Sequence, residues 1–152
     1  MLKTINILNK RARFEYEILE TYTAGMVLTG TEIKSIRLGK ANITEGFCEF
    51  SNGELFAINT QIEEYAFGNQ FNHKAKSERK LLLNKRELKS LERNVQTKGL
   101  TVIPLKLFTN EKGLAKLDIG LCRGKKTYDK RESLKEADTK RDLDRIKKEF
   151  RR

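Results

Sequence analysis

The sequence predicts a mainly β fold, an OB-like antiparallel β-barrel with two to three helices, followed by a basic and disordered C-terminal tail. Short alternating or apolar runs are separated by turn-forming residues, and two stretches between them carry the caps and spacing of amphipathic helices. After Cys122 the composition changes and apolar residues become rare. A chain of 152 residues has the size of one domain. We therefore expect a barrel over residues 1–122 and a tail over residues 123–152.

The first strand is expected to begin at Ala12. Phe14, Tyr16 and Ile18 alternate with charged residues, which is the period of a strand with one buried face, and residues 23–25 end it. Residues 29–32 then fit the S/T-x-x-E capping box, and Gly39 provides a helix stop. A short helix is predicted to follow the strand.

Asn52 and Gly53 separate two apolar runs at residues 46–50 and 55–58. Asn-Gly between such runs is the strongest short signal for a β-hairpin. Residues 63–80 lose the alternation and gather polar residues, which indicates a long exposed loop.

A second helix is framed by the cap residue Asn84 and by Gly99, and one of its faces is rich in Lys and Arg. Residues 100–108 and 114–121 predict a second hairpin, with Pro104 at an edge or bulge because proline has no N–H to donate. Closing these strands into a small barrel buries one face of each strand best. An open α+β sheet with both helices on one side is the alternative.

The net charge of +11 and the isoelectric point near 9.7 favour a polyanionic partner, above all nucleic acid, over a merely solvated basic surface. No stretch approaches the roughly 18 apolar residues of a membrane helix, and the N-terminus lacks a secretory h-region. We expect a cytoplasmic monomer with no membrane partner, in which Cys48 and Cys122 are reduced thiols.

The sequence offers little catalytic chemistry. No metal or dinucleotide motif is present, and the run from Gly120 to Lys126 fails the phosphate-loop pattern in glycine spacing and in lacking Ser/Thr. His73 with Cys48 or Cys122 would be the one nucleophilic pair. We expect no cofactor, no metal and no enzyme activity, and keep a Cys/His-dependent RNA-processing enzyme as the remote alternative.

The tail carries 13 Lys/Arg against 7 Asp/Glu in 30 residues, with six apolar side chains. Leu143, Ile146 and Phe150 form too thin a stripe to hold a free helix. Further basic clusters precede the first strand and flank both helices, and in several places they lie beside aromatic or polar residues. This pattern predicts contact with RNA phosphates and exposed bases, and a tail that folds on contact.

Five stretches, residues 9–16, 30–42, 71–73, 79–83 and 124–131, closely resemble the family of small protein B, the SsrA-binding proteins, in order and spacing. The resemblance implies an OB-like barrel that binds the tRNA-like domain of transfer-messenger RNA and delivers it to stalled ribosomes for trans-translation. It also implies that the tail, helical on binding the ribosome, enters the empty mRNA channel beside the small-subunit decoding region. A general basic RNA-binding or ribosome-assembly module is the alternative function.

Charge and resemblance together predict two sets of residues. The RNA-binding set is Asn9, Lys10, Arg11, Arg13, Glu32, Lys34, Arg37, Asn72, His73, Arg79, Lys80 and Leu82. The ribosome-engaging tail set is Gly124, Lys125, Lys126, Tyr128, Asp129, Lys130 and Arg131.

The structure has to decide the surroundings of three residues. Leu82 is as natural in a core as on an RNA-facing surface. Thr23 stands where many family members carry an acidic residue, which removes a polar contact to RNA. Ala75 stands where a proline is common, which predicts a more flexible loop.

Overall fold

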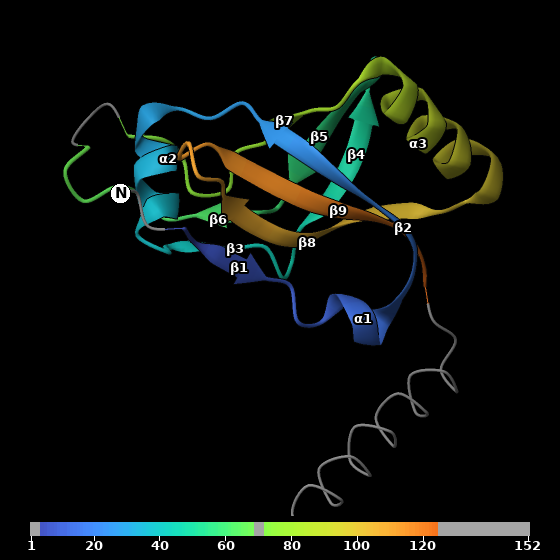
Figure 1. The fold of residues 1–152 in the computed structure, drawn as a ribbon, viewed down its shortest axis with the longest axis horizontal. Coiled ribbons are helices and arrows are strands. Elements are labelled where there is room, and N and C mark those ends of the chain that lie inside the picture. The colour runs from blue at the N-terminus through green and yellow to red at the C-terminus, as the bar shows by residue number, and fades with distance from the viewer. Residues whose placement is uncertain (1–3, 69–71, 125–152) are drawn as a thin grey trace, which may run out of the picture.

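The computed structural model describes residues 4–68 and 72–124 and contains a seven-stranded antiparallel sheet. Its strands, in spatial order, are β1 (Asn6–Leu8), β8 (Thr101–Thr109), β4 (Phe47–Ser51), β5 (Glu54–Ile58), β7 (Arg79–Leu82), β2 (Tyr16–Met26) and β9 (Ala115–Gly124). Because β8 also pairs with β9, the sheet closes on itself (Figure 1). The closure confirms the predicted OB-like barrel and excludes the open sheet.

The pairing of β2 with β9 runs from Tyr16 opposite Gly124 to Gly25 opposite Lys116, with a register shift between Ile18 and Glu20. Beyond this barrel, β3 (Ala41–Asn42) and β6 (Gln61–Ile62) pair as a small separate ladder. Aliphatic side chains from strands and helices fill the core, and the large ones with no accessible surface are Leu55, Leu117 and Ile119 from the strands, Ile36 from α2 and Leu91 from α3.

Two of the three helices in the described residues, α2 (Gly30–Arg37) and α3 (Lys85–Lys98), lie at opposite ends of the barrel (Figure 1). The capping box of α2 is complete, because Thr29 Oγ1 accepts from the Glu32 N–H and Glu32 Oε1 accepts from the Thr29 N–H. At α3, Asn84 Oδ1 accepts from the Glu87 N–H at 2.8 Å. Both helices predicted from cap residues are confirmed.

The first hairpin is confirmed as β4 and β5, with Asn52 and Gly53 both at positive φ. Those dihedrals suit a tight turn whose twist matches the two strands. The second hairpin is confirmed as β8 and β9, and the register shift between Pro104 and Lys106 places the proline at a bulge as predicted.

The prediction of a strand starting at Ala12 was wrong. Ala12–Glu15 forms the single turn α1, in which the Arg11 carbonyl accepts from the Phe14 and Glu15 N–H groups. Over four residues, one helical turn and a strand produce similar apolar patterns, so periodicity cannot separate them. The strand begins at Tyr16 and continues to Met26, one residue beyond the predicted end.

The prediction of a long exposed loop over residues 63–80 was wrong in part, because some of these residues are buried. Arg79 and Lys80 open β7, and the side chains of His73 and Arg79 are buried, with 9% and 2% of their surface accessible. A strand that starts with two cations gives no hydrophobic alternation. The short strands β1, β3 and β6 were missed because two or three residues carry no periodic signal.

The last strand extends past the predicted end at Cys122, since β9 includes Arg123 and Gly124. Gly124 therefore pairs with Tyr16 in the barrel, although it was assigned to the tail. The remaining predicted tail residues, from Lys125 to Arg131, lie outside the described residues.

Candidate nucleic-acid interface

A buried ion pair joins α2 to β7. Arg79 Nε donates to Glu32 Oε2, and both side chains are almost completely enclosed. Burial alone raises the pKa of Glu32, but hydrogen bonds from the Thr29 N–H and from Arg79, with the Arg79 charge, outweigh it and lower that pKa overall. The carboxylate is therefore held ionised beside the guanidinium.

Every N–H of the Arg79 guanidinium has an acceptor. Besides Glu32, Nη1 donates to the carbonyl and the hydroxyl of Thr60 at 2.8 and 3.2 Å, and Nη2 donates to the carbonyls of Lys74 and Ala75 at 3.3 and 3.0 Å. An arginine has five such donors, so the group is fully satisfied. Arg79 thus fixes α2, the turn between β5 and β6 and the loop before β7 relative to one another.

His73 belongs to the same buried region. Its Nε2 donates to the Ile62 carbonyl at 2.9 Å, and its Nδ1 lies 2.9 Å from Thr31 Oγ1, which donates to it in this tautomer. Next to it, Asn72 Oδ1 accepts from the N–H groups of Tyr65 and His73, and Asn72 Nδ2 donates to the Tyr65 carbonyl. His73 therefore holds the loop on α2 and β6, and Asn72 ties two parts of the loop together. In this conformation the His73 ring has no nitrogen available for catalysis.

The predicted residues near the N-terminus form a separate group around α1. The Asn9 N–H and its Nδ2 donate to the carbonyls of Leu105 and Pro104, both at 2.8 Å, so Asn9 is buried against the β8 bulge. Lys10, Arg11 and Arg13 are exposed. Asn9 therefore anchors a segment that presents three cations to solvent.

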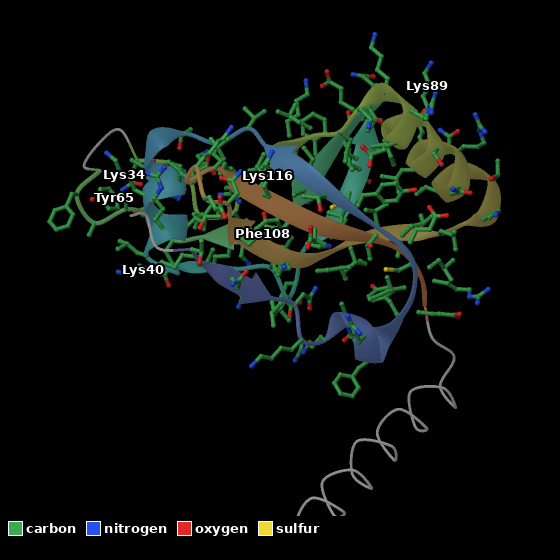
Figure 2. All side chains as sticks on the ribbon, viewed as in Figure 1. Lys34, Lys40, Tyr65, Lys89, Phe108 and Lys116 are labelled. Atoms are coloured by element: carbon green, nitrogen blue, oxygen red, sulfur yellow. The ribbon has the colours of Figure 1, made fainter. Side chains whose placement is uncertain are left out.

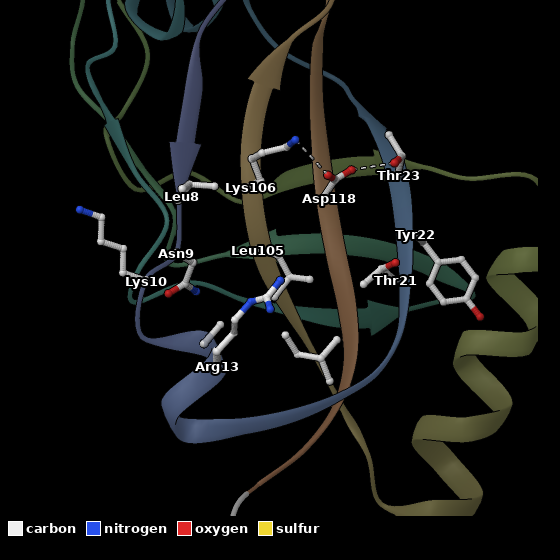
Figure 3. Close-up of a pocket in the computed structure, with 12 residues that line it drawn as sticks. Leu8, Asn9, Lys10, Arg13, Thr21, Tyr22, Thr23, Leu105, Lys106 and Asp118 are labelled. Atoms are coloured by element: carbon white, nitrogen blue, oxygen red, sulfur yellow. Dashed lines mark hydrogen bonds and ion pairs between the residues drawn. The ribbon is translucent and has the colours of Figure 1, made fainter. Parts of the chain in front are cut away.

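A groove of about 570 Å³ separates this segment from the outer faces of β2, β8 and β9 (Figure 3). Thr23 Oγ1 donates to Asp118 Oδ1 at 2.6 Å, and the other oxygen of Asp118 lies 3.7 Å from Lys106 Nζ. Although Thr23 itself is not acidic, β9 places a carboxylate directly beside it. Cations from α1 and β8 and one carboxylate therefore line the same groove.

The predicted RNA-binding residues divide by burial. Asn9, Glu32, His73 and Arg79 are buried and cannot meet RNA directly in this conformation, so they position other residues. Asn72 and Lys80 are half-buried, whereas Lys10, Arg11, Arg13, Lys34, Arg37 and Leu82 are exposed. Leu82, with half of its surface accessible and lying against Gly25, is a surface residue of the barrel wall.

The sequence reasoning missed the aromatic residues Tyr65 and Phe67. Their rings meet edge to face with centroids 5.6 Å apart, and Lys34 Nζ lies 5.5 Å from the Tyr65 centroid. Figure 2 shows Lys34, Lys40 and Tyr65 together at the α2 end of the barrel. Two aromatic residues inside a polar, non-periodic segment were the signal that could have found them.

Three other features, a metal site, a membrane-spanning helix and a reactive cysteine, find no support in the described part of the chain. It contains no group of three or more His, Cys, Asp or Glu side chains placed to hold a metal, and no helix there is long and apolar enough to cross a membrane. Burial raises the pKa of the Cys122 thiol to about 11 and that of Cys48 further still. Neither cysteine has the low pKa of a nucleophile.

A closed barrel that presents exposed cations, an exposed leucine and aromatic rings on fixed elements has the features of a small RNA-binding barrel. The SmpB protein family model matches residues 6–149. The chain belongs to the SmpB family. Several positions predicted to bind RNA are, within this architecture, buried residues that hold neighbouring elements in place.

Known relatives agree over nearly the whole chain. The SsrA-binding protein of Flavobacterium johnsoniae is 82% identical, covering 99% of both chains, and that of Flavobacterium psychrophilum is 78% identical, covering 99% of this chain and all of the relative. A solved structure described as "tmRNA-SmpB: a journey to the center of the bacterial ribosome" is 48% identical, with a TM-score of 0.69 over 85% of this chain and 94% of the solved one. The sequence relatives and the structural match therefore point to the same family.

Proposed function

We propose that this chain binds the tRNA-like domain of transfer-messenger RNA and delivers it to stalled ribosomes for trans-translation. The observation that carries the proposal is 82% identity, over almost the full length, to a protein named for binding SsrA. The solved relative named with transfer-messenger RNA and the bacterial ribosome supports the same pair of partners. We further propose a cytoplasmic monomer that acts by binding, with no catalysis of its own.

The barrel provides rigid support for RNA contacts. The Glu32–Arg79 pair locks α2 to β7, so Lys34 and Arg37 on α2 and Leu82 on β7 keep a fixed spacing. Because helices and strands fix the backbone positions of these cations, they meet phosphates without any reordering of the chain. Leu82 adds an apolar contact for a base or ribose.

In the groove beside Thr23, a carboxylate from another strand takes the place of the acidic residue that many family members carry at position 23. Asp118 is the cross-strand partner of Thr23 in the β2–β9 pair, and its carboxylate accepts the Thr23 hydroxyl. A carboxylate oxygen at this place accepts from exocyclic amino groups or ribose hydroxyls of RNA. In this chain the acidic contact therefore comes from β9 and not from β2.

The tail is assigned to the ribosome. Its 13 Lys/Arg residues among 30 match a channel lined by phosphates, and Gly124 ends the strand from which it departs. The family resemblance implies that this segment reads the empty mRNA channel. Lys125, Lys126, Tyr128, Asp129, Lys130 and Arg131 are the residues we assign to that contact.

Truncation separates the two activities. A chain ending at Gly124 keeps all of β9 and the Arg123–Glu17 ion pair, so its barrel stays complete. We expect it to bind the tRNA-like domain as tightly as the full chain and to lose peptide tagging on stalled ribosomes. Equal loss of RNA binding and tagging would contradict the division of labour.

A general RNA-binding or ribosome-assembly module is the competing function. At fixed salt, unrelated transfer RNAs in excess should displace a purely electrostatic binder and should compete poorly against a reader of RNA shape. For the enzyme alternative, Cys48→Ala and Cys122→Ala variants with full tagging activity would remove the Cys/His mechanism.

A further inference from the structure

The loop between β6 and β7 carries a preorganised aromatic surface that the proposed function does not use. Phe67 is the most exposed large apolar side chain in the described residues, with 79% of its surface accessible. Its ring rests edge to face on Tyr65, whose own ring has the Lys34 ammonium nearby. We call Phe67 and Tyr65 the aromatic platform.

Hydrogen bonds hold the platform in one conformation. Asn72 bonds the Tyr65 N–H and carbonyl at 3.0 and 2.5 Å, and the Gly68 N–H donates to the same carbonyl at 2.9 Å. A Cβ on Gly68 would lie 2.7 Å from Asn72 Nδ2, so any other residue here would displace the Asn72 amide from its present position. His73 extends the support to Thr31 of α2. Because these bonds fix the backbone on either side of Phe67, stacking a ligand on its ring needs no reordering of the described part of the loop.

The surroundings of the platform favour a nucleotide over a protein segment. Lys34 and Lys40 are exposed, and neither forms an ion pair within the described residues. The Glu63 N–H donates to the Lys40 carbonyl at 3.0 Å, which keeps this lysine beside the loop. A base stacks on one ring face while its phosphates meet nearby cations, whereas a stable protein interface needs about 800 Å² on each partner.

The position of the platform favours transfer-messenger RNA over ribosomal RNA as the nucleic acid that it contacts. It lies at the α2 end of the barrel, whereas Gly124, from which the tail departs, pairs with Tyr16 beside α1 at the other end (Figures 1 and 2). The platform therefore lies at the opposite end of the barrel from the start of the tail, on the part of the chain that the proposed function gives to transfer-messenger RNA. We propose that Phe67 and Tyr65 stack on an unpaired base of transfer-messenger RNA while Lys34 and Lys40 contact its phosphates, an inference that rests on the proposed function.

The absence of tryptophan from this chain allows a direct test. Phe67→Trp supplies a single indole at the platform, and its fluorescence should be quenched when the tRNA-like domain of transfer-messenger RNA binds. Purified small ribosomal subunits form the second arm of the experiment. Quenching by the subunit alone would assign the platform to ribosomal RNA and overturn the proposal.

Affinity measurements distinguish aromatic stacking from a general apolar contact. Phe67→Ala and Phe67→Leu should each weaken binding of the tRNA-like domain about 5- to 150-fold, the range for losing one stacked base, while Phe67→Tyr should bind normally. Leu38→Ala, which truncates another exposed apolar side chain at the end of α2, should have no effect. If Leu38→Ala weakens binding equally, or if Phe67→Leu retains affinity, the contact is generally apolar and the stacking assignment fails.

Two further controls keep the test decisive. Because Phe67 is exposed, its substitution should leave the urea midpoint unchanged. Asn72→Ala, introduced beside Phe67→Trp, should lower the fluorescence anisotropy of the free indole by releasing the loop. If the wild-type chain does not bind the RNA, the proposed function itself is wrong; if it binds and Phe67→Ala binds as tightly, only the platform is refuted.

Discussion

Replacing Glu32 by Gln isolates the charge of the buried pair. The amide keeps the size of the side chain, and glutamine also serves at the third position of a capping box, so the Thr29 contact is preserved. What is lost is the carboxylate that neutralises Arg79, whose side chain is almost fully enclosed. Removing one partner of a buried ion pair costs about 3–5 kcal/mol because the other charge stays buried.

That loss is a large part of the stability of a small domain, which is roughly 5–15 kcal/mol. We expect the free energy of unfolding in urea, followed by circular dichroism, to fall by this amount at pH 7. Glu45→Gln is the matched control, because Glu45 pairs with Arg11 at 3.1 Å in a largely exposed position. Exposed pairs contribute about 0–1 kcal/mol.

The dependence on pH gives an independent check. The pKa of Glu32 is lowered below its ordinary value of 4.5, so its stabilisation is complete above that value and is lost as the pH falls through the folded-state pKa. The difference between the wild type and Glu32→Gln should therefore shrink in acid. A cost no larger than that of Glu45→Gln, or one that stays constant down to pH 2, would refute this account of the pair.

Three further predictions concern the Asn84 cap, the two buried cysteines and the exposed Leu82. Asn84→Ala should cost about 1 kcal/mol in a urea titration because the Glu87 N–H loses its cap, and a change under a few tenths would contradict the cap. Cys48 and Cys122 should react with a thiol reagent at pH 8 only after unfolding, since burial raises both pKa values, and fast labelling of the native chain would show otherwise. Leu82→Ala should weaken binding to the tRNA-like domain while leaving the urea midpoint unchanged, whereas a lowered midpoint would return Leu82 to the core.

Cap and turn residues predicted local structure correctly because their deciding contacts lie within a few residues, whereas apolar periodicity failed at the single turn Ala12–Glu15. The capping box at Thr29, the Asn84 cap and the Asn52–Gly53 turn all depend on neighbours close along the chain. Five ordered motifs likewise identified the family, because a family pattern is itself a property of the sequence.

The site could be predicted only as a set of residues, without their roles. Arg79 was expected at a basic RNA-binding surface, but it is buried because all five of its donors find acceptors from Glu32, Thr60, Lys74 and Ala75. Those acceptors come from three separate parts of the chain, since Lys74 and Ala75 are neighbours. No hydropathy pattern distinguishes such an arginine from an exposed one.

By itself, the sequence determined the family, the barrel class, the two capped helices and the charged ending of the chain. The tertiary structure decided which polar residues are buried, where a carboxylate stands beside Thr23, and that Phe67 is exposed against the Tyr65 ring. The physical reason is distance along the chain. Thr23 and Asp118, 95 residues apart, are brought together by the pairing of β2 with β9, which also belongs to the closed barrel.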